Sequence, residues 1–110
     1  MTPPLCSSVA AVALAALFAT TAADAAKLTV TMAGTQYRPE AIAARVGDVL
    51  RFLNDDSVDH VVFVPTRGFG VDFGTQKPGT GVELPLGKPG TFEVECVIHP
   101  HMRARVTVIR

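Results

Sequence analysis

Three side chains that can bind a metal ion lie within seven positions of one another near the end of the sequence: Cys96, His99 and Met102. The chain of 110 residues contains only 2 Cys, 3 His and 3 Met, so the clustering is unusual. Soft and borderline metal ions take thiolate, imidazole and thioether ligands, and one Cys, two His and a weak axial Met are typical of copper electron-transfer sites. The cluster therefore predicts a metal site that still needs one imidazole.

Two other histidines can supply that imidazole. His60 begins an apolar stretch directly after a turn, so it can lie at the same end of a folded domain as the cluster. His101 is the alternative, but it stands between His99 and Met102. If both of these point into the site, His101 tends to point outward. We expect His60 to be the second nitrogen ligand.

The elements around the cluster are predicted to be strands. Pro100 disfavours a helical conformation for the residue before it, so Cys96–Met102 is expected to form a tight loop between two strands. Residues 92–96 and 103–108 alternate between apolar and polar side chains, as strands with one buried face do. This alternation places Cys96 in an inward-facing row.

Short strand-like stretches separated by turn residues make up the rest of the domain. The clearest of these further strands are residues 28–32, 46–53 and 60–64. The one helical candidate, residues 39–44, is too short to stand alone and suits a strand equally well. The glycine-rich residues 66–81 are expected to form a long loop or an irregular edge strand. Together these patterns predict an all-β sandwich or barrel.

Residues 1–25 are predicted to be a secretory signal peptide. Residues 9–23 carry no charge, and the run is shorter than the roughly 20 apolar residues of a membrane-spanning helix. Ala23-Asp24-Ala25 is a typical cleavage site. No Lys or Arg precedes the run, so an uncleaved membrane anchor is the alternative. Cleavage leaves a periplasmic domain, residues 26–110, with Cys96 as its only thiol and no stable membrane insertion.

The charge of the chain excludes two classes of partner. It has 10 Lys and Arg and 10 Asp and Glu, so its formal net charge is zero. Nucleic acids and anionic membranes attract strongly basic proteins, and we expect neither as a partner. Asp55, Asp56 and Asp59 form a small acidic cluster before His60. The cluster is either a solvated turn or a surface that steers a basic partner.

Taken together, these features resemble the cupredoxins, the blue-copper family that includes plastocyanin, pseudoazurin and amicyanin. The resemblance covers about residues 27–110 and is closest to the short-loop, amicyanin-like members. It is carried by His60 and by the motifs Tyr37-x-Pro39, Val46-Gly47-Asp48-x-Leu50-x-Phe52-x-Asn54, Pro89-Gly90-Thr91-Phe92 and Cys96-x-x-His99-x-x-Met102. The sequence departs from the family at Glu95, where an aromatic residue is common, and at Val97-Ile98, where Thr-Pro is frequent.

The resemblance implies a small Greek-key β-sandwich that holds one type 1 copper ion. The implied ligands are His60, Cys96 and His99 in a trigonal set, with Met102 as a long axial ligand. The resemblance also implies that Asn54 lies in the second shell and ties the two ligand-bearing loops together. The function it implies is electron transport and not enzymatic catalysis: a soluble, monomeric protein that shuttles single electrons between redox partners.

The implied partners are redox proteins such as a c-type cytochrome or a periplasmic oxidoreductase. In similar proteins the histidine of the C-terminal loop reaches the surface within an apolar patch, which makes His99 the expected exit for electrons. Ile98 and Pro100 could build that patch, with Phe69 or Phe73. Core packing is the alternative for the two phenylalanines.

Two other functions stay open from the residues alone. A periplasmic Cu(I) carrier or storage module could use the same four ligands, and the extra His101 would suit it. A Cys–His hydrolase would need Cys96 as an exposed, activated thiolate beside His60 and an aspartate. The inward phase of Cys96 argues against the hydrolase, as does Met102, which would have no catalytic role. Zinc also suits these ligand types in vitro.

Overall fold

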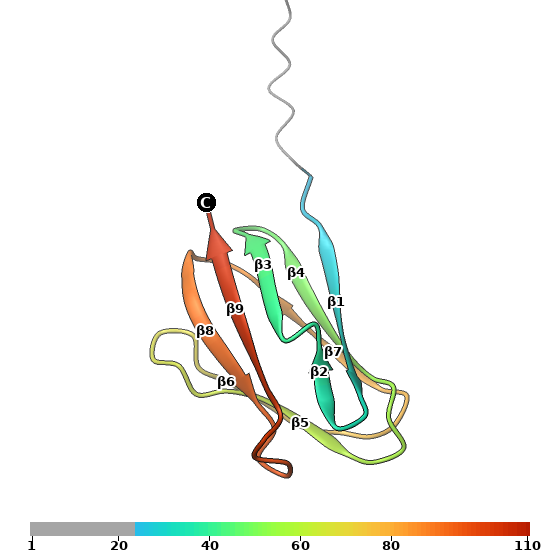
Figure 1. Cartoon of the computed structure of the whole chain (residues 1–110). Coiled ribbons are helices and arrows are strands. Elements are labelled where there is room, and N and C mark those ends of the chain that lie inside the picture. The colour runs from blue at the N-terminus through green and yellow to red at the C-terminus, as the bar shows by residue number, and fades with distance from the viewer. Residues whose placement is uncertain (1–23) are drawn as a thin grey trace, which may run out of the picture.

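The computed structural model describes residues 24–110, and most of the predicted signal peptide lies outside them. Within this range the chain forms nine strands and no helix (Figure 1). The strands are β1 (Lys27–Ala33), β2 (Gln36–Arg38), β3 (Ala41–Arg45), β4 (Val49–Asn54), β5 (His60–Val64), β6 (Val71–Gln76), β7 (Gly81–Pro85), β8 (Gly90–Glu95) and β9 (Arg103–Ile109). The described residues therefore contain no helix that is long and apolar enough to span a membrane.

The nine strands form two sheets that pack face to face (Figure 1). The strand order is β2-β1-β4-β7 in one sheet and β3-β9-β8-β5-β6 in the other. β1 pairs with β4 in parallel, and β3 pairs with β9 in parallel. The remaining pairs are antiparallel. The predicted all-β sandwich is confirmed.

Alternating burial shows why these segments are strands and where the core lies. In β9, Ala104, Val106 and Val108 are buried and the residues between them are exposed. β8 continues its buried row into Cys96, which is 1% exposed. The inward rows predicted from the sequence are therefore confirmed. Burying a side chain such as Phe92 contributes roughly 1.5–3 kcal/mol, so this row anchors the strand that leads to the cysteine.

The two ambiguous segments both contain strands. The stretch with helical character becomes β3, because it pairs with β9 along the whole of residues 41–45. The glycine-rich stretch contains β6, an edge strand of the larger sheet whose pairing with β5 shifts register between Val61 and Phe63. β5 itself lies between β8 and β6, and its first residue, His60, is fully buried.

Three connections meet at one end of the sandwich, which we call the site end (Figure 1). They are the β1–β2 turn at residues 34–35, the β4–β5 connection at residues 55–59, and the β8–β9 loop at residues 96–102. Hydrogen bonds join all three. The opposite end, the far end, includes the β3–β4 turn at residues 46–48 and the β7–β8 connection at residues 86–89.

Candidate metal site

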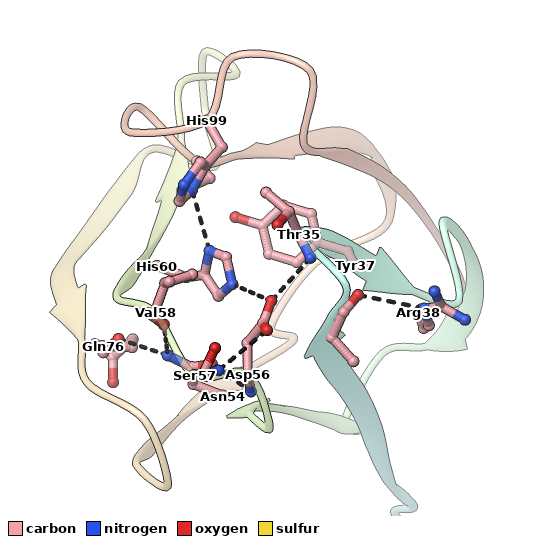
Figure 2. Close-up of polar contacts among 12 residues, drawn as sticks. Thr35, Tyr37, Arg38, Asn54, Asp56, Ser57, Val58, His60, Gln76 and His99 are labelled. Atoms are coloured by element: carbon pink, nitrogen blue, oxygen red, sulfur yellow. Dashed lines mark hydrogen bonds and ion pairs between the residues drawn. The ribbon is translucent and has the colours of Figure 1, made fainter.

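Two loops of the site end bring three of the predicted ligand side chains together. One ligand atom from each of His60, Cys96 and His99 lies within 4.8 Å of the other two. The Nδ1 atoms of the two histidines are 3.2 Å apart, and the Sγ of Cys96 is 3.7 Å from the Nδ1 of His99. Figure 2 shows the two imidazoles facing each other. The predicted convergence of His60 with Cys96 and His99 is confirmed.

The backbone of the β8–β9 loop folds into two successive tight turns. The N–H of His99 donates to the carbonyl of Cys96 at 3.2 Å, and the N–H of Met102 donates to the carbonyl of His99 at 2.8 Å. The N–H of Cys96 closes the loop by donating to the carbonyl of Met102 at 3.2 Å. The predicted tight loop between two strands is confirmed. It buries the side chain of Met102 and leaves His99 partly exposed.

The sulfur of Cys96 is buried and accepts a main-chain hydrogen bond. The N–H of Val61 donates to this Sγ at 3.2 Å, which partly balances a thiolate charge. The hydroxyl of Tyr37 donates to the carbonyl of Val61 at 2.6 Å. Burial raises the pKa of Tyr37 far above its ordinary value, with smaller contributions from Cys96 and Glu95, so Tyr37 stays protonated. A sulfur this inaccessible does not suit a hydrolytic nucleophile.

A carboxylate occupies the other side of the His60 ring. The Oδ2 of Asp56 lies 2.9 Å from the Nε2 of His60 and accepts the N–H of Thr35 at 2.8 Å (Figure 2). The Oδ1 of Asp56 accepts the N–H of Ser57 at 3.0 Å. These hydrogen bonds lower the pKa of Asp56 to about 2, with the bond to His60 the largest cause and the Thr35 N–H the next. The sequence showed Asp56 only as one of three acidic residues, although its place four positions before His60 was a usable signal.

Asn54 is fully buried and holds the β4–β5 connection. Its Nδ2 donates to the carbonyls of Val58 and Gln76 at 2.9 and 2.8 Å. Its Oδ1 accepts the N–H of Asp56 at 3.0 Å. Within residues 24–110, no hydrogen bond joins Asn54 to the loop at residues 96–102. Asn54 therefore fixes the connection that leads into His60, and the link to the β8–β9 loop that the resemblance implied is made elsewhere.

That link passes through the main chain of Thr35. The N–H of Thr35 donates to Asp56, and its carbonyl lies 3.1 Å from the Nε2 of His101. His101 is exposed and lies outside the group of three ligand atoms, as the sequence predicted. The β1–β2 turn therefore contacts both ligand-bearing loops, a role that the sequence did not reveal.

Apolar side chains are exposed around His99. Val97 and Ile98, the two residues before His99, are 63% and 48% exposed. The expected contribution of Ile98 to a surface patch fits this exposure. The two phenylalanines considered for the patch are instead packed against the core. One of them, Phe69, stacks on Phe92 with ring centroids 5.1 Å apart.

The donor set suits a soft or borderline metal ion. One cysteine sulfur and two imidazoles converge, and the carboxylate of Asp56 is directed at the far nitrogen of His60. Such a set fits copper, and it also suits zinc. Two of the three side chains are buried, so an ion held there is largely shielded from water.

The sequence matches a family of known proteins. A family model described as a cupredoxin-like domain matches residues 6–108. The methylamine utilization protein MauL of Methylophilus methylotrophus is 31% identical over 81 residues, which cover 71% of this chain and 47% of that protein. The chain therefore spans about half the length of this relative.

Solved structures share the fold. A reduced mutant of amicyanin is 25% identical, with a TM-score of 0.71, and the match covers 74% of this chain and 81% of that one. A copper-containing nitrite reductase from Thermus scotoductus SA-01 is 24% identical, with a TM-score of 0.72. That match covers 76% of this chain but only 22% of the reductase, and it bears on the fold alone.

Proposed function

Because the chain belongs to the cupredoxins, in the group of amicyanin, we propose that it is a type 1 copper protein that carries single electrons between redox partners. The observation that carries this proposal is the convergence of the Sγ of Cys96 with imidazole nitrogens of His60 and His99. Met102, buried in the same loop, is proposed as the weak axial ligand. Copper would supply the one-electron couple between Cu(II) and Cu(I).

The protein's part is to hold the ligands still while the oxidation state changes. His60 begins a strand that has neighbours on both sides and is fixed from behind by Asp56. Cys96 is fixed by the β8–β9 loop and by the N–H of Val61. Ligands that cannot move favour one compromise geometry for both oxidation states, which keeps the reorganisation small.

The partner is proposed to dock where His99 reaches the surface. Val97 and Ile98, the two residues before His99, are exposed, and an apolar contact area lets a redox partner approach closely. Asp55 and Asp59, both exposed, lie on the adjacent connection and would attract a basic partner such as a c-type cytochrome. Their exposure at the same end of the sandwich as His99 supports a role in attracting a basic partner.

The proposed location is the periplasm, after removal of residues 1–25. The uncharged run at residues 9–23 and the Ala23-Asp24-Ala25 site support export. Residues 26–110 would then be the mature, monomeric copper domain. Mass spectrometry of the exported protein tests this, because an intact N-terminus would indicate a retained anchor.

A Cu(I) carrier or storage protein is the second candidate. The exposed ring of His101 favours it, since its centroid is 6.3 Å from that of His99 and it could accept an ion on the way in or out. A carrier has no need of a Cu(II) state, whereas an electron-transfer protein must cycle reversibly.

The visible spectrum of copper-loaded protein separates the two functions. We expect intense absorption from a Cu(II)–thiolate bond that bleaches on reduction and returns on oxidation. His101→Ala is the matched control and should keep the band, because His101 is outside the ligand group. A colourless protein that binds only Cu(I) would favour the carrier.

A further inference from the structure

The β1–β2 turn has an unusual backbone conformation. Ala33 pairs with Gln36, which leaves Gly34 and Thr35 as a two-residue hairpin loop. Both loop residues have a φ of +58°, as such tight turns demand. Glycine adopts this conformation freely, but it is unfavourable for a β-branched residue such as threonine. A backbone held in such a conformation is often found at a functional site.

Thr35 uses its main chain, and not its side chain, to reach the metal site. Its N–H donates to the Oδ2 of Asp56 at 2.8 Å, and the same oxygen lies 2.9 Å from the Nε2 of His60 (Figure 2). Its carbonyl accepts the hydrogen bond from His101. A hydrogen-bonded chain therefore runs from the hairpin turn through one carboxylate to the buried imidazole.

This chain determines which nitrogen of His60 is available to a metal. Ionised Asp56 can only accept hydrogen bonds, so the Nε2 of His60 must be the protonated nitrogen. The Nδ1 of His60, which faces His99, then keeps its lone pair. The opposite tautomer would direct a hydrogen into the site and leave two acceptors facing each other on the Asp56 side.

The charge of Asp56 also lies close to the site. Its side chain is 17% exposed, and the His60 side chain that it contacts is fully buried. A negative charge in such surroundings is only partly screened by water. It stabilises the more positive oxidation state of a neighbouring metal ion more than the less positive one.

We propose that Asp56, held by the main-chain N–H of Thr35, is a positioning residue that keeps the Nδ1 of His60 free for copper and favours Cu(II) over Cu(I). The proposal rests on the proposed function. It assigns to the β1–β2 turn a part in setting the reduction potential, although no side chain of that turn enters the site.

The reduction potential of copper-loaded Asp56→Asn tests the effect of the charge. Loss of an outer-shell partner typically changes metal affinity by 10–100-fold. We expect the preference for Cu(II) over Cu(I) to fall by about 10-fold, which is a rise of about 59 mV for one electron. Asp55→Asn is the control, because it removes the same charge from an exposed neighbour. An equal shift in both variants, or a fall in Asp56→Asn, would overturn the proposal.

The tautomer is tested in metal-free protein by ¹⁵N NMR of the histidine rings. The neutral ring of wild-type His60 should be protonated at Nε2 and not at Nδ1. Asp56→Ala should give a mixture of tautomers, and Asp56→Asn takes its place if the alanine variant does not fold. Protonation of wild-type His60 at Nδ1 would overturn the proposal. Absence of a Cu(II)–thiolate band in the wild type would instead contradict the proposed function. The ¹⁵N NMR measurement on metal-free protein would still determine the tautomer of His60.

Discussion

Each end of the sandwich contains one aspartate that accepts main-chain hydrogen bonds, and the two aspartates are used differently. At the far end, the two oxygens of Asp48 accept the N–H groups of Ala26 and Arg45, both at 2.9 Å. At the site end, Asp56 accepts main-chain N–H groups too, but it also contacts the ring of His60. In both cases the main-chain bonds help to lower the pKa of the carboxyl group.

The difference predicts which part of the fold is coupled to the proposed metal site. In the part of the chain that the structure describes, the side chain of Asp48 accepts hydrogen bonds only from the main chain, at the start of β1 and at the end of β3, so it serves the fold alone. Asp56 accepts hydrogen bonds both from the main chain and from the side chain of His60, a proposed ligand. Changes at the site end should therefore alter both stability and the copper spectrum, whereas changes at the far end should alter stability alone.

Cys96→Ser, at the site end, should have the largest effect on the copper spectrum. Serine is close in size to cysteine, but its hydroxyl is a poor ligand for copper, so the Cu(II)–thiolate band should be lost completely. The metal-free fold should survive, with an unfolding free energy lower by about 1–3 kcal/mol for a buried hydroxyl. Visible absorption and urea unfolding measure the two effects. A variant that keeps an intense band would show that the sulfur of Cys96 is not a ligand.

Asn54→Ala should have the next largest effect, because it removes three hydrogen bonds from the connection before His60. The partners left without a hydrogen bond should lower the unfolding free energy by roughly 2–4 kcal/mol. Solvent access to copper should increase and the reduction potential should shift. Thr80→Ala is the control, because it removes only an exposed hydrogen bond to Lys77. An unchanged visible spectrum and reduction potential in Asn54→Ala would show that Asn54 does not influence the proposed copper site.

The convergence of His60, Cys96 and His99 could be predicted from the sequence because it depends mainly on local spacing. Cys96 and His99 lie on one short loop, and alternation in the flanking strands fixes the direction of Cys96. His60 could be added because a strand begins there. These inferences need only the periodicity of a strand and the chemistry of the side chains.

The outer contacts could not be predicted, because they join distant segments through the main chain. Thr35 and Asp56 are 21 residues apart, and the donor is a backbone N–H that any residue except proline would offer. The contacts of Asn54 depend on how β6 lies beside the β4–β5 connection. For the same reason residues 39–44 were ambiguous: the parallel pairing of residues 41–45 with β9, and not the local sequence pattern, makes this segment a strand.

Gly90→Ala probes the far end with a moderate effect. Gly90 has a φ of +142°, and a Cβ there would lie 2.6 Å from the ring of Phe69. Backbone strain and this clash should lower the unfolding free energy by roughly 1–3 kcal/mol. The visible band and the reduction potential should stay as in the wild type. Gly87→Ala is the control, because its added Cβ meets nothing within 4 Å. A shifted Cu(II)–thiolate band in Gly90→Ala would contradict the expectation that changes at the far end affect stability alone.

Asp48→Asn should have the smallest effect, and one that depends on pH. Hydrogen bonds from Ala26 first, and then from Arg45, lower the pKa of Asp48 below its ordinary value of 3.8. The ionised carboxylate therefore stabilises the fold above that value, and this contribution is lost as the pH falls through the lowered pKa. Urea midpoints should show the variant less stable than the wild type at neutral pH, with the gap closing in acid.

Asp59→Asn, at an exposed position of the site end, is the control for the charge change in Asp48→Asn. Its urea midpoint should follow that of the wild type at both pH values, because its carboxylate lies on the surface. A gap for Asp48→Asn that widens in acid would contradict the assigned role of the carboxylate. A changed reduction potential in Asp48→Asn would be more serious, since it would show that the turn at residues 46–48 is coupled to the proposed metal site. Asp48 and Asp56 would then both influence the metal, and only their distances from it would differ.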